Sequence, residues 1–227
     1  MDERAQELLE RIQRWALPEG PIECKGTWLR QVGEMRLGPD RPWFPFEGEQ
    51  WFEGDGIEFR WKARARLAPL LRASVTDAFQ GERGLLFARV LGILPMARSR
   101  GPATDKGEAM RGIAELPWRP MGFRESRRLI WRVHAPGRLH ATYDDGRTRA
   151  TVEFQVDQEG KVLGCIASDR PRPLGRMAMD TTWTTKASDY REFDHFRIPI
   201  RAEAAWVLPL GSFTYWRAEI TDFKALR

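Results

Sequence analysis

Residues 200–220 read IRAEAAWVLPLGSFTYWRAEI, and this stretch decides the fold. Two runs of alternating residues flank a Leu-Pro-Leu-Gly-Ser turn, which is the pattern of an antiparallel hairpin with one buried face. Closing the hairpin sets Glu203 opposite Arg217, and Arg201 opposite Glu219. The other face collects mostly apolar side chains: Ile200, Ala202, Ala204, Trp206, Thr214, Trp216, Ala218 and Ile220. A slip of one residue would lose both the charge pairs and the apolar face, so the pattern specifies the register.

A second hairpin is predicted over residues 45–68, PFEGEQWFEGDGIEFRWKARARLA. Folding it at the Gly-rich turn 53–56 predicts three cross-strand pairs: Phe52 with Ile57, Glu49 with Arg60 and Glu47 with Lys62. The inner face then holds Phe44, Phe46, Phe52, Phe59, Trp61, Ala63 and Ala65. Two unrelated hairpins therefore share a charged outside and an apolar inside.

Further strands fill most of the chain. A hairpin turning at Asp145-Gly146 aligns Leu139 with Val152, Ala141 with Ala150 and Tyr143 with Thr148, and another at 158–160 aligns Val156 with Val162 and Phe154 with Gly164. Strand patterns also cover residues 72–79, 85–93, 127–133 and 181–190. About eleven or twelve strands in succession tend to curl rather than stay flat. We predict one domain over residues 1–227, all-β or β-rich α+β, in which a curled antiparallel sheet forms a half-open barrel.

Two segments have helical rather than strand periodicity. Residues 1–17 predict an N-terminal amphipathic helix that packs on the sheet through Ala5, Leu8, Leu9, Ile12 and Trp15. Residues 104–116 predict a short internal helix, capped by Thr104 or Asp105 and ended by Pro117. Its narrow apolar stripe needs a surface to cover, and the concave side of a curled sheet supplies one. The helix is either a fixed plug or a mobile lid, and the sequence leaves both open.

The predicted inner face combines large rings with small alanines, which leave space for a helix, another sheet or a ligand. The leading functional hypothesis is therefore a binding protein for an apolar or amphipathic ligand, such as a lipid or acyl group. The side chains expected around the ligand are Phe44, Phe59, Trp61, Met110, Ile113, Trp118, Trp206 and Trp216. The alternatives are a closed-core structural or interaction domain, and an enzyme with a cavity carboxylate such as Glu115 or Asp180.

Composition narrows the classes of partner. The 227-residue chain has a net charge of +5, and no apolar run approaches the roughly 18 residues needed to span a bilayer. Its first residues lack the basic start and apolar run of a secretory signal, so we expect a cytoplasmic location. The basic residues are spread along the chain, which favours solvated faces over a specific nucleic-acid footprint. Arg64 and Arg66 have no assigned partner, and contact with a phosphate group stays open for them.

Motifs for catalysis or cofactor binding are absent from the sequence. It contains no GxSxG, P-loop or GxGxxG pattern, and the three histidines, His134, His140 and His195, form no metal-binding spacing. Cys24 and Cys165 stand alone, with no CxxC pair, and whether they form a disulfide is left open. We expect no cofactor and no metal, and the balance leans against an enzyme.

Three stretches resemble a bacterial family of uncharacterised proteins: GEMRLGPDRPWFPFEGEQWF at 33–52, ELPW at 115–118, and SDYREFDHFRIPIRAEAAWVLPLGSFTYWRAEITDF at 188–223. That family is a relative of the LolA/LolB lipoprotein carriers. The resemblance implies a half-open antiparallel barrel closed by helices, with an inner face that shelters acyl chains in the carriers. It supplies no catalytic residues. His195 stands where the family pattern has glycine, which predicts a different turn geometry there.

Overall fold

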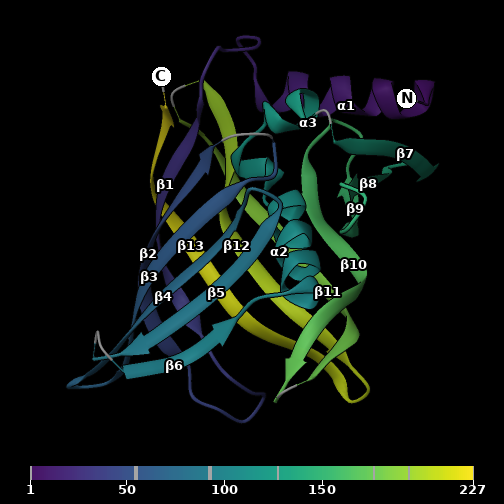
Figure 1. Cartoon of the computed structure of the whole chain (residues 1–227). Helices are drawn as coiled ribbons and strands as arrows, with labels where there is room; N and C mark the ends of the chain where they lie inside the picture. Colours follow the sequence, from purple (N-terminus) through teal and green to yellow (C-terminus); the bar gives the residue numbers. More distant parts are fainter. Residues whose placement is uncertain are drawn as a thin grey trace.

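The computed structural model describes residues 2–53, 56–91, 94–126, 128–175, 177–193 and 195–226, and it contains one curled antiparallel sheet (Figure 1). Within these residues the sheet has thirteen strands: β1 (Gly26–Met35), β2 (Phe44–Glu53), β3 (Phe59–Ala68), β4 (Leu71–Gln80), β5 (Arg83–Val90), β6 (Leu94–Ser99), β7 (Leu129–Ala135), β8 (Arg138–Asp144), β9 (Arg149–Val156), β10 (Val162–Leu174), β11 (Met177–Phe193), β12 (Phe196–Leu208) and β13 (Gly211–Leu226). The predicted β-rich half-barrel is confirmed.

The strand order explains how the sheet encloses a helix. The order is β6-β5-β4-β3-β2-β1-β13-β12-β11-β10-β9-β8-β7, so every pair of neighbouring strands is also consecutive in the sequence, except β1 and β13. That pairing joins the two halves of the chain and leaves β6 and β7 as the edges. Helix α2 (Pro102–Ala114) lies in the connection between these edges and packs against β4, β5, β8, β9 and β10. In Figure 1 the sheet curls around it.

The C-terminal hairpin has the predicted register in the part away from its turn. Glu203 is opposite Arg217 and Arg201 is opposite Glu219 on β12 and β13. Arg201 forms an ion pair with Glu219 at 3.3 Å, whereas Arg217 turns to Glu34 on β1, at 2.6 Å. The predicted register therefore holds from Arg201 to Ala204, and Arg217 takes its ion-pair partner from the neighbouring strand β1. Nearer the turn, a bulge between Ala204 and Ala205 shifts the pairing by one residue and places Trp206 opposite Phe213.

The register predicted for residues 45–68 is wrong by two residues. Phe52 pairs with Phe59 rather than Ile57, which shifts Glu49 to Lys62 and Glu47 to Arg64. Ile57 has left the ladder and is buried, with its carbonyl oxygen against Gly112 of α2. Gly54 and Asp55 of the predicted turn lie outside the described residues. Because the shift is an even number of residues, every inner side chain stays on the inner face.

The hairpin of β8 and β9 is also two residues out of the predicted register. Ala141 pairs with Val152, and Tyr143 with Ala150. The carboxylate of Asp145 accepts hydrogen bonds from the N–H groups of Arg147 and Thr148, at 2.8 and 2.6 Å, and so builds a longer turn than the two-residue one predicted. In the next hairpin Val156 pairs with Val162 as predicted, but a bulge gives Phe154 the partner Cys165 instead of Gly164.

The remaining strand predictions correspond to β4, β5, β7 and β11. Residues 92, 93 and 127, at the ends of two predicted strands, lie outside the described ranges. Strand β6 was not predicted. His195 has φ +74, the left-handed conformation that glycine favours, so the different turn geometry expected there is not observed.

Both main helices lie close to their predicted positions. Helix α1 (Glu3–Ala16) is capped by Asp2 and buries Ala5, Leu8, Leu9 and Ile12, as expected, while Trp15 is half-buried against Tyr190. Helix α2 begins two residues before the predicted start, with Gly101 as its N-cap and Pro102 in its first turn. It is followed by a 3₁₀ turn (Leu116–Trp118) and by the short α3 (Gly122–Glu125). The predicted caps Thr104 and Asp105 therefore lie inside the helix, because Asp105 instead accepts a hydrogen bond from Gly84 N–H, at 2.8 Å.

Candidate functional site

The predicted ligand-binding residues lie on the concave face or on the segment that covers it. Phe59, Trp61, Trp118 and Trp206 are buried, while Phe44 and Trp216 are half-buried. Met110 and Ile113 of α2 are fully buried in the same apolar cluster as Phe59 and Trp61. In this conformation α2 therefore occupies the concave face itself.

Four rings make a continuous chain of contacts across this face. Phe46 packs edge-on against Trp61 with centroids 5.6 Å apart, and it stacks on Trp216 at 6.1 Å. Trp216 in turn meets Trp118 edge-on at 6.5 Å. These rings come from β2, β3, β13 and the 3₁₀ turn, so the sheet brings together three of the predicted residues, Trp61, Trp118 and Trp216.

Trp206 belongs to a separate group around Arg170 of β10. Its indole stacks on Tyr215 with centroids 5.9 Å apart. The Arg170 guanidinium lies 4.2 Å from the ring centre of Trp183 and 5.6 Å from that of Trp206. The Tyr215 hydroxyl accepts a hydrogen bond from Trp183 Nε1 at 3.0 Å. Trp183, Trp206 and Tyr215 therefore surround the buried guanidinium of Arg170, and this part of the concave face is not purely apolar.

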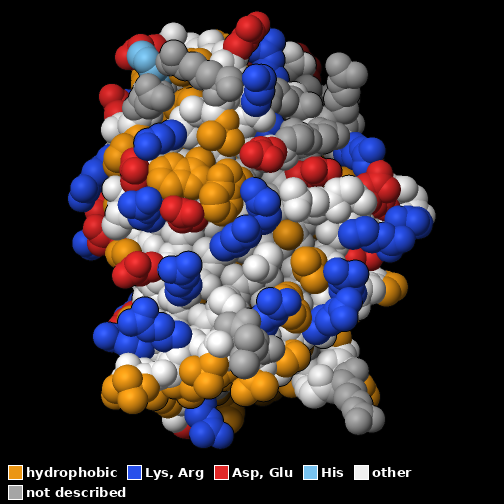
Figure 2. Space-filling view, turned by 60° about the vertical axis from the view of Figure 1, so that its left-hand side comes forward, with side chains coloured by type: hydrophobic (Ala, Val, Ile, Leu, Met, Phe, Trp, Pro, Cys, Tyr) orange, Lys and Arg blue, Asp and Glu red, His pale blue; other side chains and the backbone are white. Residues whose placement is uncertain are grey.

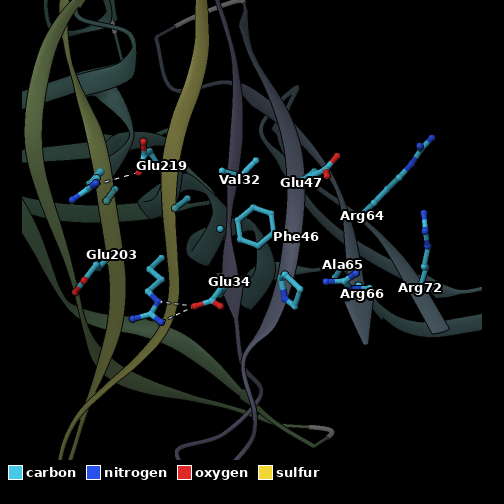
Figure 3. Close-up of a pocket in the computed structure, with 16 residues that line it drawn as sticks. Val32, Glu34, Phe46, Glu47, Arg64, Ala65, Arg66, Arg72, Glu203 and Glu219 are labelled. Carbon is cyan, nitrogen blue, oxygen red and sulfur yellow. Dashed lines mark hydrogen bonds and ion pairs between the residues drawn. The ribbon is translucent and has the colours of Figure 1, made fainter. Parts of the chain in front are cut away.

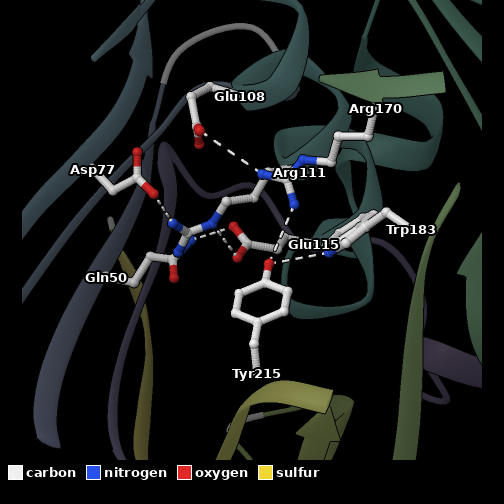
Figure 4. Close-up of polar contacts among 8 residues, drawn as sticks. All are labelled: Gln50, Asp77, Glu108, Arg111, Glu115, Arg170, Trp183 and Tyr215. Atoms are coloured by element: carbon white, nitrogen blue, oxygen red, sulfur yellow. Dashed lines mark hydrogen bonds and ion pairs between the residues drawn. The ribbon is translucent and has the colours of Figure 1, made fainter. Parts of the chain in front are cut away.

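A network of charged side chains lies between α2 and the sheet, and the sequence reasoning did not predict it (Figure 4). Arg111 of α2 is its centre: Arg111 Nε donates to Glu115 Oε1 at 2.8 Å, and Arg111 Nη1 contacts the carboxylate of Asp77 on β4. Gln50 of β2 donates to the other oxygen of Glu115. Arg111 also lies over the rings of Phe59 and Trp61, at 4.7 and 5.1 Å from their centres.

Arg170 extends the network to the opposite side of α2. Its guanidinium lies 3.7 Å from Glu108 Oε1 and donates to the Tyr215 hydroxyl at 3.4 Å. Three carboxyl groups, those of Asp77, Glu108 and Glu115, thus face two guanidinium groups inside an otherwise apolar half-barrel. We name this set of five side chains the α2 network.

Burial dominates the protonation of the α2 network. Removal from water raises the pKa of Glu108 well above its usual range, and the nearby Asp77 carboxylate adds to the rise. Burial also raises the pKa of Glu115, against the opposing effect of Arg111. For Arg111, burial alone would lower the pKa, but its carboxylate neighbours raise it. Arg111 therefore stays charged, while Glu108 favours its neutral form.

Two buried polar atoms of this region, the acceptor Gln50 Oε1 and the donor Arg170 Nε, have no hydrogen-bond partner within the described residues, whereas the carboxyl groups of Glu108 and Asp77 share a hydrogen bond. Buried polar groups are nearly always paired in native proteins, because an unpaired one costs about 1–3 kcal/mol. The interface between α2 and the sheet therefore has unused hydrogen-bonding capacity for both donors and acceptors.

The N-terminal part of α2 is held by ion pairs to both sides of the half-barrel. Asp105 pairs with Arg83 of β5 at 3.1 Å. Lys106 pairs with Asp169 of β10 at 2.7 Å and with Asp180 of β11 at 3.5 Å. Asp180, one of the two carboxylates considered for catalysis, is thus an exposed partner of a lysine, whereas the other, Glu115, belongs to the α2 network.

A separate depression of about 670 Å³ lies on the outer side of the sheet over β1, β2, β3, β12 and β13 (Figure 3). On one side of it Glu34 pairs with Arg217 and Glu219 with Arg201. On the other side, in the described part of the chain, three arginines form no ion pair: Arg64, Arg66 and Arg72. Glu47 is opposite Arg64 in the ladder but forms no ion pair with it. This shallow site is charged and open, and so is unlike the predicted apolar cavity.

The outer face also carries aromatic rings, which the sequence reasoning did not assign to either face. Trp28 and Trp51 are opposite each other on β1 and β2 and are half-buried. Cations cover both rings: Arg60 lies 5.0 Å from the centre of Trp51, and Lys224 lies 5.2 Å from that of Trp28. Because these ring faces already have cation partners, they are poor stacking platforms for nucleic-acid bases.

With this geometry in view, comparison with known families gives a match over residues 7–218 to DUF6544, a family of unknown function. The chain belongs to this family. No curated protein matches it. The resemblance to a family of uncharacterised proteins is thereby confirmed.

Solved structures similar to this DUF6544 chain share its fold. A LolA superfamily protein from Nitrosomonas europaea matches with a TM-score of 0.55 and 10% identity, covering 98% of this chain and 93% of the other. A DUF1329 family protein from Desulfovibrio piger matches with a TM-score of 0.55, 10% identity, and coverage of 98% and 92%. A domain assigned to outer membrane lipoprotein sorting from Vibrio parahaemolyticus matches with a TM-score of 0.50, 10% identity, and coverage of 98% and 91%. The LolA-like half-barrel is thus confirmed as a fold. Among the helices described, none is long and apolar enough to cross a membrane.

Proposed function

We propose that this DUF6544 protein binds an amphipathic, lipid-like molecule between the concave face of its sheet and α2. The apolar part of the ligand would contact the aromatic side chains and the apolar face of α2, and its polar end would meet the α2 network. The proposed contact residues are Phe44, Phe59, Trp61, Met110, Ile113, Trp118, Trp206 and Trp216. Burial of apolar area, at about 25 cal/mol per Å², would drive association.

The observation that carries this proposal is the mixed character of the surface under α2. A helix that only plugs a barrel is most stable with an apolar face, since a buried ion pair is often no better than well-packed apolar residues of the same size. Here Met110 and Ile113 share the buried side of α2 with Glu108 and Arg111. A surface that offers both apolar contacts and unpaired polar atoms matches the two ends of an amphipathic ligand.

Binding at this site requires α2 to act as a lid. Met110 and Ile113 have no exposed surface in this conformation, so a ligand must displace part of the helix. Lys106 forms ion pairs with Asp169 and Asp180, and we name these two pairs the latch of α2. They are accessible to solvent, because both carboxylates are about half exposed. Exposed ion pairs contribute about 0–1 kcal/mol each, and they are therefore contacts that can open and close readily.

The fold comparison supports the same ligand class. One of the similar structures is a domain assigned to outer membrane lipoprotein sorting, and another is a LolA superfamily protein. A lipid or acyl ligand is the part of that description that the aromatic inner face of this chain can accommodate. A role in lipoprotein transfer is not part of the proposal.

Native mass spectrometry of the purified protein, followed by organic extraction, tests the proposal. We expect a mass increment from a lipid or fatty acid that survives desolvation and is released by solvent. A bare chain mass, together with no binding of a fluorescent fatty acid, would contradict it.

Two tryptophan variants locate the site. Trp216→Ala removes a half-buried ring that stacks on Phe46 and is expected to weaken binding of the fluorescent fatty acid by about tenfold. Trp51→Ala removes an indole of equal size from the outer face and should leave the affinity unchanged. Equal losses in both variants would argue against the concave face as the site.

A closed-core interaction domain is the second candidate, and the complete burial of Met110 and Ile113 favours it. Lys106→Ala separates the two functions. If α2 is a lid, loss of the latch should speed uptake of the fluorescent fatty acid, while Lys224→Ala, which loses a 4.0 Å pair with Asp222 on β13, should not. A fixed plug predicts no uptake in either variant.

A further inference from the structure

The exposed apolar side chains of this protein are concentrated at one end of the sheet. Thirteen large apolar side chains are exposed within the described residues, and ten of them lie in or next to the turns β1–β2, β3–β4, β5–β6, β10–β11 and β12–β13. The antiparallel order places these five turns at the same end, opposite α1 (Figure 1). We name this end the tip surface and represent it by Leu37, Leu70, Leu91, Leu94, Met177 and Leu210.

These residues are exposed by position and not by poor packing. Leu70 and Leu210 occupy the turns themselves and are 92% and 104% exposed. Scattered apolar side chains on a surface are normal, but a contiguous set at one end marks a contact surface. Figure 2 shows hydrophobic side chains gathered along the lower end of the molecule, with arginine and lysine just above them.

The turns at the opposite end have the reverse composition. Residues 53–58, 80–83, 135–138, 156–161 and 193–197 include seven acidic and four basic residues. Within the described residues, none of these turns has an exposed large apolar side chain. The apolar tips are thus a property of these five turns and not of the turns of the sheet in general.

The tip surface is basic, whereas the turns at the other end of the sheet are mainly acidic. The segments 36–43, 66–72, 89–98, 172–179 and 207–212 contain eight arginines and a single acidic residue, Asp40. Arg66 and Arg72 flank the β3–β4 turn and form no ion pair within the described residues. Arg89 and Arg98 lie on the two strands that the β5–β6 turn joins. A row of apolar tips is therefore backed by a row of cations.

From this arrangement we infer that the tip surface docks on the surface of an anionic phospholipid bilayer. Leucine and methionine side chains at the turns enter the boundary between headgroups and acyl chains, while the arginines behind them lie at the level of the phosphates. An anionic leaflet attracts nearby basic residues, and the acidic opposite end orients the molecule with its tips toward the membrane. A protein partner with an acidic, apolar surface is the competing occupant.

This inference goes beyond the proposed ligand site and does not depend on it. The tip residues are distinct from the eight proposed ligand contacts. Trp206→Ala, which alters the concave face, should therefore keep membrane docking. A variant that docks on vesicles but binds no lipid ligand, or that binds the ligand but does not dock, would show that ligand binding and membrane docking are separate properties.

Vesicle flotation of the full chain tests the inference. We expect binding to phosphatidylcholine vesicles that contain phosphatidylglycerol, weaker binding to phosphatidylcholine alone, and release at high salt. Leu70→Ser with Leu210→Ser should lower the partition coefficient by about tenfold or more. Because both side chains are almost fully exposed, the double variant should fold normally, which its circular dichroism spectrum and melting temperature check.

The matched control replaces two exposed apolar residues away from the tips. Ile130→Ser with Leu163→Ser removes side chains on β7 and β10 that are about half exposed, and it should leave vesicle binding unchanged. Equal losses in the tip and control variants would overturn the inference. So would failure of the unmodified protein to float with anionic vesicles, and so would self-association in solution that Leu70→Ser with Leu210→Ser abolishes while vesicle binding persists.

Discussion

Removal of Arg111 is the sharpest test of how α2 is held in the half-barrel. The Arg111 side chain is 13% exposed and pairs with Asp77 and Glu115, whose side chains are 8% and 11% exposed. Arg111→Met keeps most of the side-chain length but leaves both carboxylates buried without their cation. Breaking a buried pair in this way costs about 3–5 kcal/mol. For a chain of this size, that corresponds to a fall in melting temperature of about 6–20 °C.

The assay is urea unfolding followed by circular dichroism. Arg217→Met is the control, because Arg217 pairs with Glu34 at 2.6 Å on the solvent side, and its loss should cost no more than about 1 kcal/mol. Neutralising both partners, through Asp77→Asn and Glu115→Gln in the Arg111→Met background, should recover part of the loss. A stability of Arg111→Met within about 1 kcal/mol of the unmodified protein would refute the reasoning.

Three further predictions concern α2 and the buried groups around it. Gly112→Ala should cost about 1–3 kcal/mol in thermal unfolding, because the new Cβ would lie 2.2 Å from the carbonyl oxygen of Ile57. Gly107→Ala in the same helix has its nearest neighbour at 3.9 Å and should stabilise by about 0.5–1 kcal/mol, so losses in both would contradict the packing. Because burial raises the pKa of Glu108, the folded chain retains a proton that the unfolded chain releases from its ordinary pKa of 4.5 upward, and this group costs stability as the pH rises. Glu108→Gln should therefore flatten the decline in urea midpoint with rising pH, and an unchanged slope would contradict the assignment. Burial raises the pKa of Cys165 to about 12, so a thiol reagent should label it only on unfolding, and rapid labelling of the native protein would count against its burial.

The faces of the strands were predictable from the sequence, but the registers were predictable only in part. In the C-terminal hairpin the charge pairs and the apolar face agree on one alignment, and the structure adopts it up to a bulge between Ala204 and Ala205. Over residues 45–68 a shift of two residues keeps Glu47 opposite a cation, Arg64 instead of Lys62, and keeps each side chain on its face. Cross-strand charge pairs and the apolar face therefore fit the predicted and the observed register of this hairpin equally well. The burial of Ile57 against α2, a tertiary contact, accompanies the observed one.

The aromatic part of the candidate site followed from alternation, whereas the charged part was missed. Signals for it were present: Glu108, Arg111 and Glu115 recur at helical spacing, and Asp77 alternates with Ala73 and Phe79 on the inner face of β4. For Arg170 the local pattern is misleading, because the register of β10 shifts between Ala167 and Arg170. A bulge of this kind changes which residues point inward, and the sequence alone does not mark its position. Cys24 and Cys165 do not form a disulfide with each other, which answers the question that the sequence left open.

The central claim is that an amphipathic ligand binds on the concave face beneath α2, and photo-crosslinking with a diazirine-labelled fatty acid tests it most directly. After irradiation and proteolysis, mass spectrometry of the peptides identifies the labelled segments. The account predicts adducts in α2 and in the strands that carry Trp61, Trp206 and Trp216, reduced by excess unlabelled fatty acid. Adducts confined to the tip surface or the outer face, or no adducts that excess fatty acid reduces, would contradict it.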